Sequence, residues 1–474
     1  MKIVMAAAEC APFAKAGGLA DVIGALPQEL AKLGHEVQVI IPKYSLIPER
    51  YVQQFHKIEE HSFDFKEETA NYAMHELDKH GVQFLFLEND SYFERDSIYG
   101  QDDAERYAFF TRAVLDFLAR SETAPDVVHV HDWHTAVLPF LLKEDPQYQQ
   151  LSSRVKTVLT IHNLQFQGNF SKQVFLEQYR MGEGFYDNGQ VAWHGNFNSL
   201  KTGILYADKL TTVSPNYRDE ILTAAYGEGL ENLLAEREAD LQGILNGIDT
   251  ATYDPQADEH IAQTFSAGDL EGKQANKRAI QKRCGLPEQP DVPLLTMVSR
   301  LSGQKGIDAL EQSLPEFLEG DAQFVLLGSG EAHFEEFFQR LEVDYAGKVS
   351  VHLGFDESFA HQLYAGADIF LMPSHFEPCG LSQLISMRYG TIPAVNRTGG
   401  LRDTVEEYDE EQKTGTGFLS DFKAGSPFDE ALSRALSYYY QPDHWQALIH
   451  NGMKKDSSWS RSAKDYEGLY ASLN

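Results

Sequence analysis

Residues 1–42 read MKIVMAAAECAPFAKAGGLADVIGALPQELAKLGHEVQVIIP, and this stretch decides the fold. The apolar run from Lys2 to Ala8 predicts a buried strand, and the pattern from Leu19 to about Leu33 predicts a helix. A second apolar run, Glu36 to Ile41, predicts the next strand. A strand, a turn, a helix and a second strand in this order are typical of a nucleotide-binding unit in an α/β protein.

The turn between the first strand and the helix holds Lys15, Gly17 and Gly18. It matches neither G-x-G-x-x-G nor G-x-x-x-x-G-K-[ST], the two glycine-rich loops that hold phosphates in nucleotide-binding folds. This turn is therefore incomplete as a nucleotide site, and a lysine with two glycines at the end of a strand needs another explanation.

The rest of the chain alternates apolar runs with helix-length segments in two halves. Continuous Val, Ile and Leu runs separated by helices are typical of parallel sheets covered on both faces. The predicted strands are VQFLFLEN, VVHVHD and VKTVLTIHN in the first half, and PLLTMVSR, QFVLLGSG, VSVHLGF, IFLMPSH and IPAVNR in the second. The fold class is therefore predicted to be α/β, with two Rossmann-like domains facing a deep interdomain cleft.

A stretch rich in Gly, Asp and Pro separates the two halves, and it places the boundary near Leu245 to Asp249. We predict an N-terminal domain over residues 1–245 and a C-terminal domain over residues 246–455. Residues 456–474 are predicted to form a helix that packs back on the N-terminal domain.

The composition is that of a globular protein with an acidic surface. Hydrophobic residues make up 42% of the 474 residues, which is enough for sizeable cores. The formal net charge of −31 disfavours nucleic acid and anionic membranes as partners. Three widely spaced cysteines, Cys10, Cys284 and Cys379, favour a reducing cytoplasm over a disulfide scaffold. We expect no signal peptide and no transmembrane helix.

Charged and polar side chains follow the predicted strands. In open α/β sheets ligands bind beyond the carboxyl ends of the strands, so these residues are the candidates for a site. In the second half Arg300 and Lys305 follow one strand, and glycine turns that lead into helices follow others. Fixed cations and free N–H groups at helix starts both bind phosphate. No D-x-D pair occurs in the sequence, so the pattern predicts a diphosphate site without a metal.

Several of these residues also have a purely structural interpretation. An arginine such as Arg300, taken alone, more often forms a surface ion pair. A histidine such as His162, taken alone, is more often a core residue whose hydrogen bonds are made within the protein. His131 and His134 in HDWH suggest a metal, but they flank a strand-to-helix break with no Cys or third His nearby. Glu377 is harder to explain structurally, because a proline and a glycine hold it at the start of a helix.

Eight motifs together resemble one known family. The motifs are KAGGLADV, HDWHT, TIHN, TVSPNY, NGID, SRLSGQKG, HFEPCGLSQL and TGGLRDTV, and they occur here in the order found in bacterial glycogen synthases and plant starch synthases. The match runs from Met1 to about Trp459. This resemblance implies a retaining glucosyltransferase of the two-domain GT-B type that uses ADP-glucose and elongates glycogen or another α-1,4-glucan, with no cofactor and no metal.

The resemblance also implies which residues act. Lys15 and the glycine turn would contact the diphosphate and glucose of the donor across the cleft, which explains why that turn is incomplete by itself. The implied catalytic residues are Glu377, His162, Lys305, Arg300 and Asp132. The implied donor-binding residues are Lys15, Gly17, Gly18, Arg300, Lys305, Cys379, Gly380, Leu381, Gly399 and Gly400. The implied acceptor-binding residues are Asp21, Asp132, Tyr99 and Arg106.

One position departs from a wider pattern. Many related retaining transferases carry a second Glu eight residues after the first, and here that position is Ile385. The synthase branch also lacks this Glu, so the departure supports the branch and leaves ribose recognition unassigned.

Three other functions are weighed against this one. A related retaining glucosyltransferase would use UDP-glucose or a small acceptor. A nucleotide-linked oxidoreductase is disfavoured, because no G-x-G-x-x-G opens the first helix and no acid ends the second strand. A glucan-binding protein without activity is disfavoured, because Lys15, Arg300, Lys305 and Glu377 are all present. The oligomeric state stays open.

Overall fold

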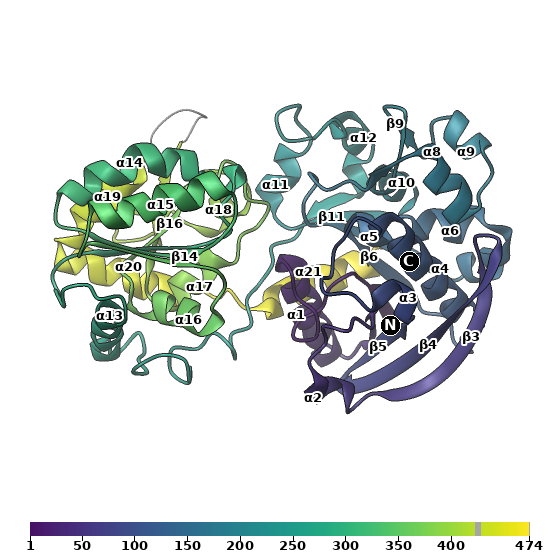
Figure 1. Cartoon of the computed structure of the whole chain (residues 1–474), viewed down its shortest axis with the longest axis horizontal. Coiled ribbons are helices and arrows are strands. Elements are labelled where there is room, and N and C mark those ends of the chain that lie inside the picture. The colour runs from purple at the N-terminus through teal and green to yellow at the C-terminus, as the bar shows by residue number, and fades with distance from the viewer. Residues whose placement is uncertain (422–427, 474) are drawn as a thin grey trace. The chain divides into compact units, whose positions relative to one another are not determined.

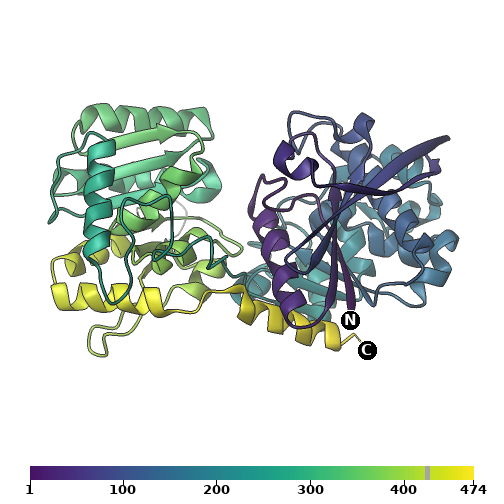
Figure 2. The same ribbon diagram turned by 90° about the horizontal axis from the view of Figure 1, so that it is seen from below.

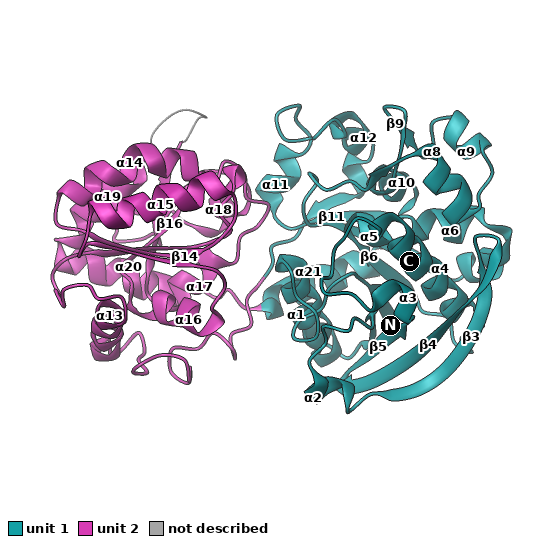
Figure 3. Cartoon of the chain, viewed as in Figure 1, with its two compact units in different colours: residues 1–246, 459–474 teal, residues 247–458 magenta. Residues whose placement is uncertain are grey.

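The computed structural model describes residues 1–421 and 428–473, which divide into two compact units (Figure 1 and Figure 3). Unit 1 comprises Met1–Asn246 and Trp459–Asn474, and unit 2 comprises Gly247–Ser458. Each unit contains a largely parallel sheet with helices packed against it. The predicted α/β class with two Rossmann-like domains is confirmed.

The described residues of unit 1 form one sheet of nine strands, parallel except at one edge. The central strand β1 pairs with β2 on one side and with β6 on the other. The spatial order is β12 (Leu241–Gly243), β11 (Lys209–Thr212), β7 (Lys156–Ile161), β6 (Val127–His131), β1 (Lys2–Ala6), β2 (Glu36–Pro42), β5 (Val82–Glu88), β4 (Glu68–Lys79) and β3 (His56–Phe65).

The hairpin of β3 and β4 contradicts the expectation of parallel strands throughout. β3 runs antiparallel to β4, and β4 runs antiparallel to β5. Lys66 and Glu67 connect the two strands, and Lys66 has a left-handed backbone with φ 56°. In β3 only Phe63 and Phe65 are buried, so most of the strand faces solvent. An edge strand of this kind carries no continuous apolar run, which is why that criterion does not detect it.

The helices of unit 1 include one from each end of the chain. Helix α21 (Trp459–Ala471) packs beside α1 (Gly18–Lys32), as Figure 2 shows. Ser460 Oγ donates a hydrogen bond to Glu29 Oε2 at 2.9 Å, and His35 Nε2 lies 3.1 Å from Glu467 Oε1. The other helices are α2 (Glu49–Val52), α3 (Asp90–Phe93), α4 (Asp103–Arg120), α5 (Asp132–Thr135), α6 (Leu138–Glu144), α7 (Gln149–Ser152), α8 (Lys172–Val174), α9 (Gly184–Asp187), α10 (Ser199–Tyr206), α11 (Pro215–Glu220) and α12 (Glu231–Glu236).

Unit 1 also contains a small antiparallel sheet, β8 (Asn169–Phe170), β10 (Asn196–Asn198) and β9 (Ala192–Trp193). In neither unit does a helix of the described residues combine the length and the apolar character that crossing a bilayer requires.

Unit 2 contains a sheet of six parallel strands within its described residues. The order is β15 (Val349–Leu353), β14 (Gln323–Gly328), β13 (Leu294–Val298), β16 (Ile369–Met372), β17 (Ile392–Asn396) and β18 (Phe418–Ser420). Helices lie on both sides of this sheet in Figure 1. They are α13 (Glu271–Arg283), α14 (Ile307–Glu319), α15 (Ala332–Asp344), α16 (Glu357–Gly366), α17 (Ser382–Arg388), α18 (Gly399–Thr404), α19 (Asp429–Tyr439) and α20 (Pro442–Lys454).

A buried ion pair joins α13 to the sheet of unit 2. Lys277 Nζ lies 2.7 Å from Asp368 Oδ2, and the side chains are 1% and 6% exposed. The same carboxylate oxygen accepts the backbone N–H of Leu294 at 2.8 Å, while Lys277 also donates to the carbonyls of Pro290 and Val292. The charges are therefore paired and their remaining hydrogen-bonding capacity is largely used, which makes the burial tolerable.

Replacing Lys277 with Ala should lower the free energy of unfolding of unit 2 by about 3–5 kcal/mol, because Asp368 would remain as a buried unpaired charge. Chemical unfolding followed by hydrogen exchange in unit 2 peptides measures the change. Lys282→Ala removes the same charge from an exposed position of the same helix and should stay within about 0.5 kcal/mol of the wild type. Equal effects of the two substitutions would contradict the role of the ion pair.

Candidate active site

In unit 1 the carboxyl ends of β6 and β7 bring Asp132 and His162 together. The two strands pair in parallel, so the residues that follow them lie side by side. Asp132 Oδ1 accepts a hydrogen bond from the backbone N–H of His162 at 2.7 Å. Asp132 has φ 53°, a conformation that residues other than glycine rarely adopt and that is concentrated at functional sites.

Burial sets the protonation of this pair. Loss of solvent raises the pKa of Asp132 to about 7; the Glu9 carboxylate adds to the rise, and backbone N–H groups of His162 and Asn163 oppose it. Loss of solvent lowers the pKa of His162 to about 3. At neutral pH His162 is therefore uncharged, and Asp132 lies close to the midpoint of its titration.

The loop that carries Lys15 is held by Glu9, a residue for which the sequence yields no prediction. Glu9 is 3% exposed, and its Oε2 accepts the backbone N–H groups of Ala16 at 2.5 Å and Gly17 at 2.8 Å. Its Oε1 accepts the hydroxyl of Tyr99. The sequence does contain a sign of this role, because Glu9 is an acidic residue among the apolar residues that follow the first strand.

Lys15 itself forms an ion pair with Asp21 in the first turn of α1. Lys15 Nζ lies 2.6 Å from Asp21 Oδ1, and the side chains are 40% and 30% exposed. Neither Gly17 nor Gly18 has a positive φ. A Cβ at Gly17 would meet its nearest atom at 3.9 Å, and one at Gly18 would meet none within 4 Å. Packing within unit 1 therefore does not require glycine at these two positions.

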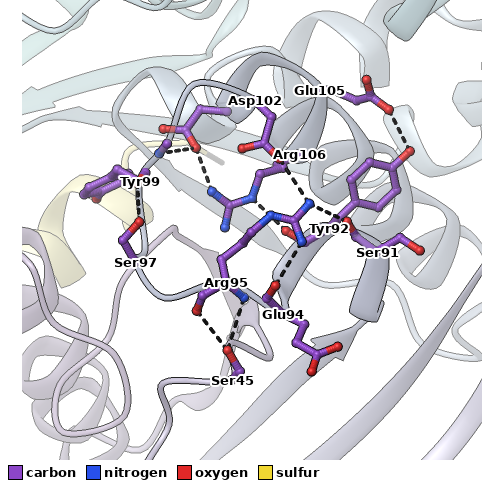
Figure 4. A network of polar contacts seen from close by, with 12 residues as sticks. Ser45, Ser91, Tyr92, Glu94, Arg95, Ser97, Tyr99, Asp102, Glu105 and Arg106 are labelled. Atoms are coloured by element: carbon purple, nitrogen blue, oxygen red, sulfur yellow. Dashed lines mark hydrogen bonds and ion pairs between the residues drawn. The ribbon is translucent and has the colours of Figure 1, made fainter.

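Of the implied acceptor residues Tyr99 and Arg106, Tyr99 is partly exposed and Arg106 is buried. Arg106 is 1% exposed, and its guanidinium donates to the carbonyls of Tyr92 at 2.7 Å and Ile98 at 3.1 Å and to the Asp103 carboxylate at 2.7 Å (Figure 4). These bonds shape the segment that carries Tyr99. Because its side chain is enclosed, Arg106 can support that segment but does not present its charge at the surface of unit 1.

In unit 2 the loops after β13 and β16 bring Lys305 and Glu377 into contact. Lys305 Nζ lies 2.6 Å from Glu377 Oε2, and the side chains are 16% and 9% exposed. Ser374 Oγ donates to the same carboxylate oxygen at 3.0 Å. Arg300, by contrast, is exposed and has no ion-pair partner among the described residues. At this edge Lys305 is therefore paired, whereas Arg300 is solvated.

The loops after β16 and β17 pack against each other. The backbone N–H of Gly400 donates to the carbonyl of Glu377 at 2.9 Å. A Cβ at Gly400 would lie 2.2 Å from the carbonyl oxygen of Cys379, so only glycine permits this approach. The other implied donor residues of these loops are Gly380 and Leu381, just before α17, and Gly399, the first residue of α18.

Phe355 is a further candidate that the sequence did not reveal, although it ends a predicted strand segment. It follows β15 at the carboxyl edge of the sheet, and its side chain is 83% exposed. An exposed aromatic ring at this edge can stack on a nucleobase. Throughout the described residues, no group of three or more His, Cys, Asp or Glu side chains is arranged to hold a metal ion.

The fold and these residues define a class of protein. The chain has two units with largely parallel sheets, and the carboxyl edge of each sheet holds a cation paired to a carboxylate and a glycine-containing loop. This arrangement is that of a GT-B glycosyltransferase. Residues 2–236 match the family model of the starch synthase catalytic domain, and residues 279–454 match that of glycosyl transferases group 1.

The chain belongs to the glycogen synthase family and is a glucosyltransferase. It is 45% identical to the glycogen synthase of Bacillus cereus (strain ZK / E33L) over 477 residues, which cover 100% of both chains. It is 46% identical to that of Geobacillus thermodenitrificans (strain NG80-2), over 100% of this chain and 98% of the relative.

Solved structures agree with this assignment. The catalytic domain of starch synthase IV from Arabidopsis thaliana, bound to ADP and acarbose, matches with a TM-score of 0.90 and 34% identity over 99% of each chain. A sucrose-phosphate synthase from Thermosynechococcus elongatus matches with a TM-score of 0.61 and 18% identity, over 100% of this chain and 99% of that one, which shows a shared fold alone.

Replacing Asp132 with Asn should change how stability depends on pH. Folding raises the pKa of Asp132 from 3.8 to about 7, so the folded state keeps a proton that the unfolded state releases. The stability that this proton contributes is fully present below about pH 4 and is lost as the pH rises through about 7. Between these values the wild type should lose up to about 1.4 kcal/mol per pH unit relative to Asp132→Asn.

Chemical unfolding of the wild type and of Asp132→Asn from about pH 4 to about pH 8 measures this difference. Hydrogen exchange in peptides of β6 and β7 assigns it to unit 1. Parallel stability curves of the two proteins would show that the pKa of Asp132 is not raised.

Proposed function

We propose that the protein transfers glucose from ADP-glucose to the non-reducing 4-hydroxyl end of glycogen or another α-1,4-glucan, with retention of configuration. Full-length similarity to glycogen synthases carries this proposal. ADP, the leaving group of the proposed reaction, is bound in the starch synthase IV structure, which supports a donor linked to ADP. A UDP-glucose donor or a small acceptor is not favoured by these relatives.

Unit 2 supplies most of the contacts to the nucleotide in this proposal. Arg300 is exposed at the carboxyl edge, and Lys305 lies at the same edge with its ammonium group on Glu377. These two cations would bind the diphosphate, and the loops around Cys379 and Gly400 would enclose the glucose. Phe355 would stack on the adenine ring, since it is the aromatic side chain exposed beyond β15.

Unit 1 supplies contacts to the sugar and the acceptor. Lys15 and the open backbone of Gly17 and Gly18 would approach the donor, and the absence of a packing reason for these glycines supports a surface kept free for a ligand. Asp132 and His162 would contact the glucose. Asp21 and Tyr99 would lie on the acceptor side, with Arg106 acting through the segment that carries Tyr99.

The chemistry follows from the charges. The bond between the anomeric carbon and the diphosphate oxygen breaks, so negative charge grows on the leaving group while the sugar gains positive charge. Arg300 and Lys305 would stabilise the first charge and Glu377 the second. The acceptor 4-hydroxyl would attack from the face that the diphosphate leaves, and its proton would pass to the departing phosphate oxygen.

A donor competition tests the proposal. The protein is incubated with glycogen and either ADP-glucose or UDP-glucose, and release of the nucleoside diphosphate is measured together with lengthening of the glucan. ADP-glucose should be turned over faster. A reaction without glycogen separates transfer from hydrolysis. Equal or faster turnover of UDP-glucose would overturn the donor assignment, and transfer to a monosaccharide in preference to glycogen would overturn the acceptor assignment.

Lys305→Ala and Glu377→Ala should impair the enzyme differently. Removing a fixed group that meets developing charge typically lowers turnover by ~10²–10³-fold. Lys305→Ala should also weaken ADP binding, because ADP already carries charge in the ground state. Glu377→Ala should leave ADP affinity within a few-fold of the wild type, because this carboxylate would act on the sugar.

ADP titrations, turnover on glycogen and melting curves of both variants measure these effects. Lys282→Ala, with the same change of charge on an exposed helix position, is the matched control and should keep wild-type turnover. Near-normal turnover of Glu377→Ala, or loss of activity that only follows unfolding, would show that the catalytic assignment is wrong.

A further inference from the structure

Two histidines are in direct contact where β6 and β7 end. His131 is the last residue of β6, and its Nδ1 lies 3.0 Å from Nε2 of His162, which directly follows β7. The His131 side chain is 0% exposed, whereas His162 is half-buried. One proton must lie between these two nitrogens, because two lone pairs or two N–H groups would repel each other.

Both rings are neutral near neutral pH, since burial lowers the pKa of His162 to about 3 and the pKa of His131 well below its ordinary value. Each ring then carries one N–H, and two arrangements satisfy the contact. In the first, His131 Nδ1–H donates to His162 Nε2, and His162 carries its own proton on Nδ1. In the second, His162 Nε2–H donates to His131 Nδ1, and His131 carries its proton on Nε2.

The surroundings of His131 separate the two arrangements. Its Nε2 is buried and has no hydrogen-bond partner among the described residues. The ring of His129 lies beside it, tilted by 31° with centroids 4.1 Å apart. Both nitrogens of His129 are engaged, one with the Tyr470 hydroxyl at 2.8 Å and one with the Thr160 hydroxyl at 2.6 Å. A proton on His131 Nε2 would therefore lack an acceptor, and buried N–H groups without acceptors are rarer than unused lone pairs.

We propose that His131 is a positioning residue that fixes His162 in the tautomer with its proton on Nδ1, so that His162 presents a neutral N–H donor to a hydroxyl of the transferred sugar. The second half of this statement rests on the proposed function. In this tautomer His162 Nε2 is occupied and Nδ1 carries a proton, so the ring has no lone pair free for a reacting group. His162 is then a hydrogen-bond donor in the transfer and cannot act as its general base.

Nitrogen-15 NMR of histidine-labelled protein without substrate tests the tautomer directly. The signals of His162 are identified as those missing from His162→Gln. Nδ1 of His162 should be protonated and Nε2 unprotonated. Protonated Nε2 would overturn the proposal. Since this measurement needs no turnover, its result is independent of whether ADP-glucose is the donor.

Two substitutions of similar size test the consequence for activity. His131→Asn places an amide N–H near the position of Nδ1 and should keep turnover within a few-fold of the wild type. His131→Leu offers no donor and should lower kcat/KM for ADP-glucose by roughly tenfold or more. In the NMR spectrum of His131→Leu, the proton of His162 should no longer be confined to Nδ1. Equal activity of the two variants would overturn the positioning role.

His129→Leu is the control for packing. It removes the bonds to Tyr470 and Thr160 but none to His162, so it should lower the melting temperature and leave the tautomer of His162 unchanged. Failure of the proposed function has a different signature, namely a wild-type protein that does not turn over ADP-glucose while His162 still carries its proton on Nδ1.

Discussion

The constraint on which the rest of the structure depends is the burial of parallel strands on both faces. The last residues of β6 and the whole of β14 are enclosed, so an ionisable side chain within such a strand must be neutral or paired. Charge can therefore gather only where the strands end. In unit 1 this edge carries Asp132 and His162, and in unit 2 it carries Arg300, Lys305 and Glu377. The same restriction places polar groups beyond the strand ends in both units.

The same burial gives neighbouring residues opposite responses. Asp132 is driven toward its protonated form, and the histidines beside it are driven toward their uncharged form, because low exposure penalises charge of either sign. Positive charge beside the end of β1 is carried by Lys15, which is 40% exposed and lies in a loop whose backbone N–H groups bond to Glu9. At this edge of unit 1 the buried histidines are therefore neutral, and the cation lies at the surface.

The sequence predicts the parts of the fold that follow from local pattern. Strands such as β13 and β16 are buried runs and were predictable, whereas β3 is mostly exposed and was not. The rule that ligands bind beyond the carboxyl ends of strands correctly predicts sheet-edge positions for Lys15, His162, Lys305 and Glu377. It could not reveal that Arg106 is enclosed, because its partners are carbonyls chosen by tertiary packing. Phe355 escapes the rule because an aromatic side chain in an apolar run reads as part of the core, and Glu9 escapes it because its partners are backbone N–H groups of a loop.

Both cations that are paired in the described residues of the candidate site are held by carboxylates, Lys15 by Asp21 and Lys305 by Glu377. A protein with a net charge of −31 repels an anionic donor at long range, so attraction has to be short-ranged. A diphosphate that approaches Arg300 first would then be met by Lys305 as well, whose ammonium group has further N–H donors besides the one on Glu377. In the proposed reaction Glu377 would then face the sugar, where positive charge would develop. The ion pair would therefore hold the two groups side by side, Lys305 for the diphosphate and Glu377 for the sugar.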